Sequence, residues 1–495
     1  MKTQSTESRS AKPIHPWLKS IHVAYVPGPE AAGLDDVVDG ILRHFRLRGH
    51  RVQDVPNEET DVILTTARFG EPLGWREAPL FFVRRKFKLS RTPTTYALVK
   101  IQPAQFQQLL ARFEEVLKKA PPDPQDYAFP GLSPQAYRVL FEQGRRGGSI
   151  LALERLVQAQ AKSIHILLIV GDERPQAAYH FDLVGAYPKS PAEDIEAFYE
   201  DIVLRMVTTL STHEVTQHEV VGEIIPRAVW ARLDTPSAMS VAGRELGLRS
   251  FFTEMVRIAD LAQVPAVNDA VASQYSEGCF ATWDPKLGAL IATVTGSARP
   301  IDKGQITDND LAVIVGVRPD GKGALIRHVE DKRNDPPSSE SVEMMAMDAH
   351  LPRVALDPSW GISTSAPVVR SKLHGHRGIA AFDPRWVEYI PLDPAYYHYL
   401  VSCATEAQAH GIQSAFARAA ALQNPDDPRQ VVFTVLPGHG AVIAEKWVPG
   451  KRPFQVLWEF MEAGILQVAS RIPQGPMSYS PAADGRMRLQ EEGER

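Results

Sequence analysis

The sequence predicts an α/β fold with two doubly wound α/β layers followed by a β-rich C-terminal domain. Three observations support this class. Strand and helix patterns alternate in the first half of the chain. The near-continuous apolar run 164–170 is typical of a strand that is covered on both faces. Beyond residue 301 the pattern changes to pairs of strands joined by tight turns, which are typical of antiparallel sheet.

The N-terminal α/β domain is predicted to span 18–148. It begins with the strand "IHVAYVPG", a helix over 34–48 and the strand "DVILTT", which together form a β-α-β unit. Gly28 and Gly33 lack the G-x-G-x-x-G spacing, so we predict no dinucleotide site there. The strand "TYALVKI" and the amphipathic helix "PAQFQQLLARFEEVLKKA" follow.

A second α/β domain is predicted over 149–270. Its first strand is the apolar run "IHILLIV", and a long helix follows in which Ser190 is the N-cap and Pro191 the first helical residue. Glycines and arginines near 145–148 mark the boundary before this domain. The change of pattern near 264–272 marks its end.

The β-rich C-terminal domain is predicted over 271–473, and the ends 1–17 and 474–495 lack periodicity and are predicted to be disordered. The segment 284–296, "DPKLGALIATVTG", is ambiguous. Asp284 as N-cap, Pro285 at the first position and apolar residues at helical spacing favour a helix. The alternative is a β-hairpin, since "ALIATVT" is equally acceptable in a strand.

Composition limits the class of protein. The chain has 495 residues, of which 44% are hydrophobic and 23% charged, as in soluble proteins with several domains. A net charge of -5 argues against nucleic acid as partner. Two cysteines, Cys279 and Cys403, exclude a disulfide framework, and no apolar run approaches the roughly 20 residues of a membrane span. We expect a cytoplasmic homo-oligomer with a small-molecule substrate.

Two histidine segments are candidates for a functional site. His374 and His376 in "SKLHGHRG" would point to one face of a strand and share a metal ion or an anion, and Arg377 beside them favours an anion. His439 lies between two glycines before a strand, as ligands and catalytic bases often do. Glu445 would share a face with it if the strand were regular. The alternatives are histidines that serve only a loop or a turn.

Two carboxylates flank the ambiguous segment. Glu277 precedes it and Asp302 follows it, so they meet only if the flanking chain folds back. Carboxylates with an imidazole are ligands that suit Mn²⁺, Mg²⁺ or Zn²⁺. The alternatives are an exposed loop residue for Glu277 and a cap for Asp302.

One family resemblance involves the same residues. Glu277 beside Cys279, an apolar segment ending in Thr295–Gly296, then Pro300 and Asp302 resemble the core of the L-fucose and L-arabinose isomerase superfamily, and His439 resembles that family's late, glycine-flanked histidine. The resemblance implies the fold described above and a divalent ion, Mn²⁺ first, held by Glu277, Asp302 and His439. Here, however, the cysteine follows the glutamate, and two extra residues precede the proline.

Three functions remain open from the sequence. The first is a metal-dependent sugar isomerase, in which the ion stabilises an enediol, Glu277 or Asp302 moves the proton, and His374, His376 and Arg377 bind substrate. The second is a metal-dependent hydrolase or lyase on a small oxygen-rich substrate, with the ion activating water or an enolate. The third is a non-catalytic sugar-binding protein of the same fold.

Overall fold

The structure, a computed structural model, describes most of the chain. The described residues are 20–28, 33–67, 69–70, 74–75, 93–117, 164–181, 186–189, 192–211, 218–245, 278–294, 306–396 without 322, 339 and 362, 406–469 without 425, then 473 and 477–490. The predicted disordered N-terminus 1–17 and both predicted domain boundaries lie outside these residues.

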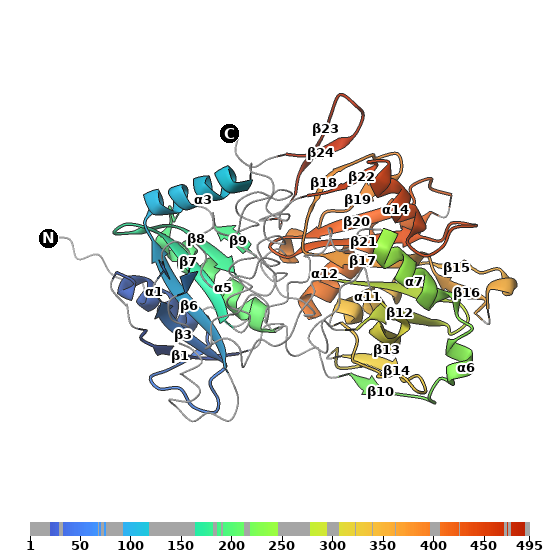
Figure 1. The fold of residues 1–495 in the computed structure, drawn as a ribbon, viewed down its shortest axis with the longest axis horizontal. Coiled ribbons are helices and arrows are strands. Elements are labelled where there is room, and N and C mark those ends of the chain that lie inside the picture. Colours follow the sequence, from blue (N-terminus) through green and yellow to red (C-terminus); the bar gives the residue numbers. More distant parts are fainter. Residues whose placement is uncertain are drawn as a thin grey trace.

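A seven-stranded sheet forms the core of the first part of the molecule (Figure 1). Its order is β2-β1-β3-β6-β7-β8-β9, with parallel pairing up to β7 and antiparallel pairing beyond it. The strands are β1 (His22–Val26), β2 (Arg51–Gln53), β3 (Val62–Ala67), β6 (Thr94–Ile101), β7 (Ile164–Gly171), β8 (Pro175–Phe181) and β9 (Ala186–Lys189). The parallel pair β6 and β7 joins the two predicted α/β segments, so both contribute to a single sheet.

Helices cover both faces of this sheet. α1 (Asp35–Leu47) and α5 (Ile195–Ser211) pack together over one face, where Gly40 gives room for the ring of Tyr199. α3 (Pro103–Leu117) lies on the other face, where the ring of Phe106 is 4.9 Å from that of Tyr179. Burial on both sides explains the continuous apolar run of β7.

A nine-stranded, mainly antiparallel sheet forms the second part, coloured from green at β10 through yellow to red in Figure 1. Its order is β10-β14-β13-β12-β11-β17-β21-β20-β19. The strands are β10 (Glu219–Val220), β11 (Cys279–Asp284), β12 (Ala289–Thr293), β13 (Leu311–Val317), β14 (Ala324–Arg327), β17 (Val369–Gly375), β19 (Val387–Tyr389), β20 (Val431–Leu436) and β21 (Gly440–Lys446). The α/β class with a β-rich C-terminal region is confirmed.

The described part of the ambiguous segment, 284–294, forms a turn and a strand of a β-hairpin, and the prediction of a helix was wrong there. β11 and β12 pair antiparallel, and Asp284 begins the turn between them by accepting a 2.8 Å hydrogen bond from the Leu287 N–H. Gly288 completes the turn at φ 61°. All residues of both strands are buried, so the alternation that identifies a half-buried strand is missing from the sequence.

Helices also cover both faces of the larger sheet. One face carries α11 (Glu340–Asp348), α12 (Glu406–Ala417) and α13 (Ala420–Gln423). The other carries α7 (Asp234–Glu245) and α14 (Gln455–Glu462). The short helix α6 (Arg227–Trp230) directly precedes α7 in the chain. No helix among the described residues is long and apolar enough to span a bilayer.

A four-stranded sheet joins the end of the chain to this part, in the order β22-β18-β24-β23. The strands are β18 (Ile379–Phe382), β22 (Leu466–Val468), β23 (Tyr479–Pro481) and β24 (Met487–Leu489). The prediction of disorder over 474–495 was therefore wrong for 477–490. Tyr479 anchors the segment, since its ring packs on Phe382 and its hydroxyl donates to the Ile379 carbonyl at 2.9 Å. Two short pairs complete the strands: β4 (Phe69–Gly70) with β5 (Gly74–Trp75), and β15 (Arg353–Ala355) with β16 (Ser365–Pro367).

Candidate metal centre

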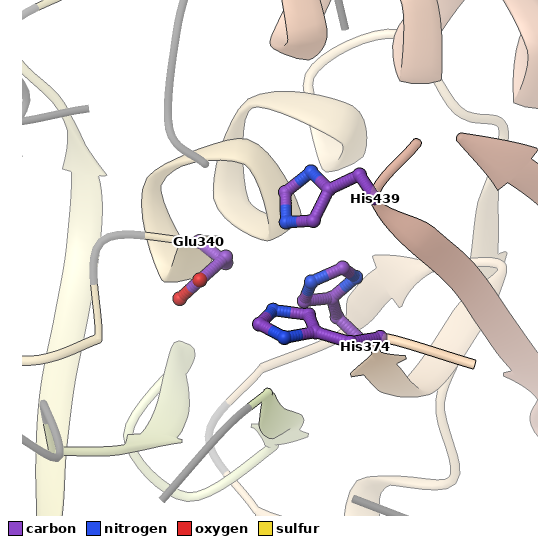
Figure 2. A group of neighbouring side chains, drawn as sticks. Glu340, His374 and His439 are labelled. Atoms are coloured by element: carbon purple, nitrogen blue, oxygen red, sulfur yellow. The ribbon is translucent and has the colours of Figure 1, made fainter. Parts of the chain in front are cut away.

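Four buried side chains converge on the helix-covered face of the nine-stranded sheet that carries α11 and α12. Glu340, His374, His376 and His439 each offer one ligand atom, and these atoms all lie within 4.8 Å of one another. Figure 2 shows Glu340, His374 and His439 pointing toward one another from three separate elements. Such spacing of three nitrogens and one oxygen allows a single metal ion to be bound.

β17 and the residues after it supply two of the imidazoles. His374 lies in β17 and pairs in register with Cys279 of β11 and Val442 of β21. His376 follows two residues later, just after the strand ends, and its ring centroid is 5.4 Å from that of His374. The alternation of side chains along a strand, which predicted a shared face, thus brings both rings to the same cluster.

A tight turn supplies the third imidazole. The His439 N–H donates to the Leu436 carbonyl at 3.0 Å, and Gly438 has φ 72°, as the third position of a type II turn requires. Gly440 then begins β21 against the other histidine segment. A Cβ at Gly440 would lie 1.9 Å from the Gly375 carbonyl oxygen, so any other residue would push the two histidine segments apart.

A hydrogen bond sets the nitrogen that His374 presents. His374 Nδ1 is 3.1 Å from the Ala441 carbonyl oxygen, which can only accept. Nδ1 therefore carries the proton, and the lone pair of the neutral ring is on Nε2. The Gln408 amide nitrogen of α12 lies 3.1 Å from His439 Nδ1 and, since it can only donate, makes Nδ1 the acceptor.

The carboxylate comes from the first residue of α11. Burial raises the pKa of Glu340, but His374, the Ser338 hydroxyl and His376 outweigh burial and hold the pKa below its usual value. Ser338 donates a short hydrogen bond to the Glu340 carboxylate. The site therefore favours positive charge beside this carboxylate, and a divalent ion bound to an ionised carboxylate and neutral imidazoles would supply that charge.

A buried ion pair ties α11 to β17 behind the cluster. Lys372 is on the same face of β17 as His374, and its ammonium contacts the carboxylate of Asp348 at the end of α11. Both side chains are buried. The pair links the helix that carries Glu340 to the strand that carries His374.

The structure brings some of the predicted site residues together, and others lie outside the part of the chain that it describes. His439, predicted as a ligand, lies in the cluster with His374 and His376, which were predicted to bind substrate. Arg377 is buried next to them. Glu277 and Asp302 lie outside the described residues.

Glu340 was missed by the sequence prediction. Acidic residues are common in the first turn of any helix, and Glu340 precedes the first histidine of the cluster, His374, by more than thirty residues. Nothing in the local pattern distinguishes it from an ordinary helix start. The one available signal was its burial, which depends on packing that the sequence pattern does not show.

Glu445 lies on the opposite face of the sheet, in register with Ser371 and Val431, and not beside the histidines. Its two carboxylate oxygens accept 2.9 Å hydrogen bonds from the N–H groups of Phe454 and Leu457. Glu445 therefore caps the start of α14, and Phe454 at φ 64° is held in the left-handed region by this contact. Burial raises the pKa of Glu445 to about 7, against the opposing effect of both N–H groups.

This shift predicts that stability falls as pH rises through the weakly acidic range. The unfolded carboxyl releases its proton near pH 4.5, whereas the folded one retains it to about 7. The native state therefore binds more protons in between, and the free energy of unfolding should fall by up to about 3 kcal/mol from pH 4.5 to 7. Urea denaturation of wild type and Glu445→Gln across this range measures the term as a difference in slope. Parallel pH profiles would contradict it.

The chain matches no protein-family model, and comparisons with curated proteins and with solved structures gave no significant similarity.

Proposed function

We propose that this protein is a metal-dependent enzyme, in which a divalent ion held by Glu340, His374, His376 and His439 acts on a small oxygen-rich substrate as a hydrolase or lyase. The observation that carries the proposal is the convergence of these four ligand atoms, with the His374 lone pair directed away from Ala441. A ring whose Nδ1 is held by a backbone carbonyl, together with an ionised carboxylate, suits the binding of a cation.

The ligand set also bears on which ion binds. Three imidazoles and one carboxylate suit Zn²⁺ or Fe²⁺ better than Mg²⁺, which prefers oxygen ligands. Mn²⁺, the ion expected from the family resemblance, falls between them. A bound ion would act as a Lewis acid on a substrate oxygen or on water. Arg377, buried next to His376, is the residue that we propose to attract an anionic group of the substrate.

Sugar isomerisation is the second candidate, and a specific observation favours it. Cys279, the cysteine of the Glu-Gly-Cys motif, opens β11 in register with the cluster residue His374. The chain therefore enters the sheet at Cys279, next to the cluster. This position of the motif supports aldose-ketose activity, which stays a prediction. The homo-oligomeric state also stays a prediction.

Elemental analysis of protein purified without chelator tests the metal proposal. We expect about one equivalent of a transition ion per chain. Because the ion binds the native state only, a concentration 100 times the dissociation constant should stabilise the protein by about 2.7 kcal/mol. Thermal melts with Zn²⁺, Mn²⁺ and Mg²⁺ should show decreasing stabilisation in that order.

Substrate panels then separate the reaction classes. Hydrolysis or elimination of small esters, amides and hydroxy acids supports the first candidate, and aldose-ketose conversion supports the second. Metal binding with sugar binding but no turnover would support a non-catalytic sugar-binding protein. Absence of bound metal, together with identical melts, would remove the basis of the proposal.

A further inference from the structure

A buried arginine from the first part of the molecule contacts the turn that carries His439. Arg205 lies on α5, which packs on the seven-stranded sheet, and its side chain is 1% exposed. Its Nη1 donates a 2.5 Å hydrogen bond to the Gly438 carbonyl oxygen, in the residue directly before His439. In Figure 1, α5 lies on the side of the first sheet that faces the larger one.

Gly438 is held on both sides of its backbone. Its carbonyl accepts from Arg205, and its N–H donates to the Pro473 carbonyl at 2.6 Å. At φ 72° this residue determines the direction in which the chain enters His439. The two contacts thus act at the point that aims the imidazole, and one of them comes from the other part of the molecule.

Burying a guanidinium is costly unless its donors are used. A turn in a hairpin does not need such a group, because the Leu436 carbonyl already closes it with the His439 N–H. The Arg205 contact therefore adds a constraint on this turn from outside the hairpin. A ligand that must stay within a fraction of an ångström of its productive position needs such a constraint.

We infer that Arg205 is a positioning residue for His439, and that metal binding at the candidate centre is coupled to docking of α5 against the larger sheet. The inference rests on the proposed metal-binding function. By linkage, binding of an ion that requires the aligned His439 strengthens the Arg205 contact, and loss of that contact lowers the affinity for the ion. The metal would then connect the two parts of the molecule.

Two substitutions and one control test this. Arg205→Met removes the donor and keeps an unbranched chain, Arg205→Lys keeps one cationic donor, and Arg43→Met removes a half-exposed arginine that binds Glu196 at the start of α5 at 2.6 Å. Co²⁺ serves as the metal, since its visible absorption reports ligand geometry. We expect Arg205→Met to weaken Co²⁺ 10- to 100-fold, as losses of outer ligand partners do, and to alter the spectrum. Arg205→Lys should recover part of the loss, and Arg43→Met should bind as wild type.

Hydrogen exchange, measured in the wild-type protein and in Arg205→Met, tests the coupling directly. Addition of Zn²⁺ should slow exchange in 200–211 of α5, and the effect should vanish in Arg205→Met. Unchanged exchange in α5 on metal binding, or an Arg205→Met variant with wild-type affinity and spectrum, would overturn the inference while the metal proposal stands. A wild-type protein that binds neither ion would overturn both.

Discussion

Replacement of His376 by alanine is expected to weaken divalent-metal binding by more than about 100-fold. Loss of an outer-shell partner alone costs 10- to 100-fold in metal affinity, and a direct ligand contributes more. His376 is the best ligand to remove, because it follows the end of β17 and makes no pairing within the sheet. The metal-free fold should therefore persist, and the stabilisation by added Zn²⁺ should disappear.

Competition titrations with Co²⁺ measure this loss. His350→Ala is the matched control, because His350 is an exposed histidine just beyond the end of α11. It should leave both the affinity and the melting temperature unchanged. Glu340→Gln keeps the size of the side chain and removes its charge, so it should also lower the affinity for the metal ion. Wild-type affinity in His376→Ala would show that His376 is not a ligand, and absence of binding to wild type would show that the cluster is a set of packed histidines without a bound ion.

Breaking the buried pair of Lys372 and Asp348 is expected to have the largest effect on stability. Burial lowers the pKa of Lys372 and raises that of Asp348, while their mutual attraction opposes both shifts. Removing one partner leaves a buried group without its counter-charge, which costs about 3–5 kcal/mol. Lys372→Met and Asp348→Asn should each lose this much free energy of unfolding.

The double variant Lys372→Met/Asp348→Leu distinguishes a stabilising pair from a positioning one. Apolar replacement of both partners is often nearly neutral for stability, so its loss should be far smaller than the sum of the single losses. If the pair also fixes α11 against β17, the double variant should still bind metal more weakly than wild type. Arg488→Ala breaks an exposed pair with Asp484 and should cost no more than about 1 kcal/mol. Additive losses from the two single changes would show that the two side chains do not interact.

The sequence by itself determined the elements that depend on short-range patterns. Parallel β-α-β alternation, the strand pairs beyond residue 301 and the turn "LPGH" follow from local preferences, because proline and glycine restrict the backbone in the same way in any context. The same holds for His374 and His376, whose spacing on a strand requires a common face wherever the strand lies. His439 was recognisable by its flanking glycines.

Only the tertiary structure decided which distant residues these elements bring into contact. The hairpin over 284–293 was hidden because both faces of the sheet are covered, and covering removes the alternation that identifies strands. The tail at 477–490 became ordered through the packing of Tyr479 on Phe382, a long-range contact. Glu340 joins the histidines because α11 docks on the face of the nine-stranded sheet that carries them. Arg205 contacts Gly438, although the two residues are 233 positions apart in the sequence. Contacts between residues so far apart depend on the packing of whole elements, which local sequence preference does not specify.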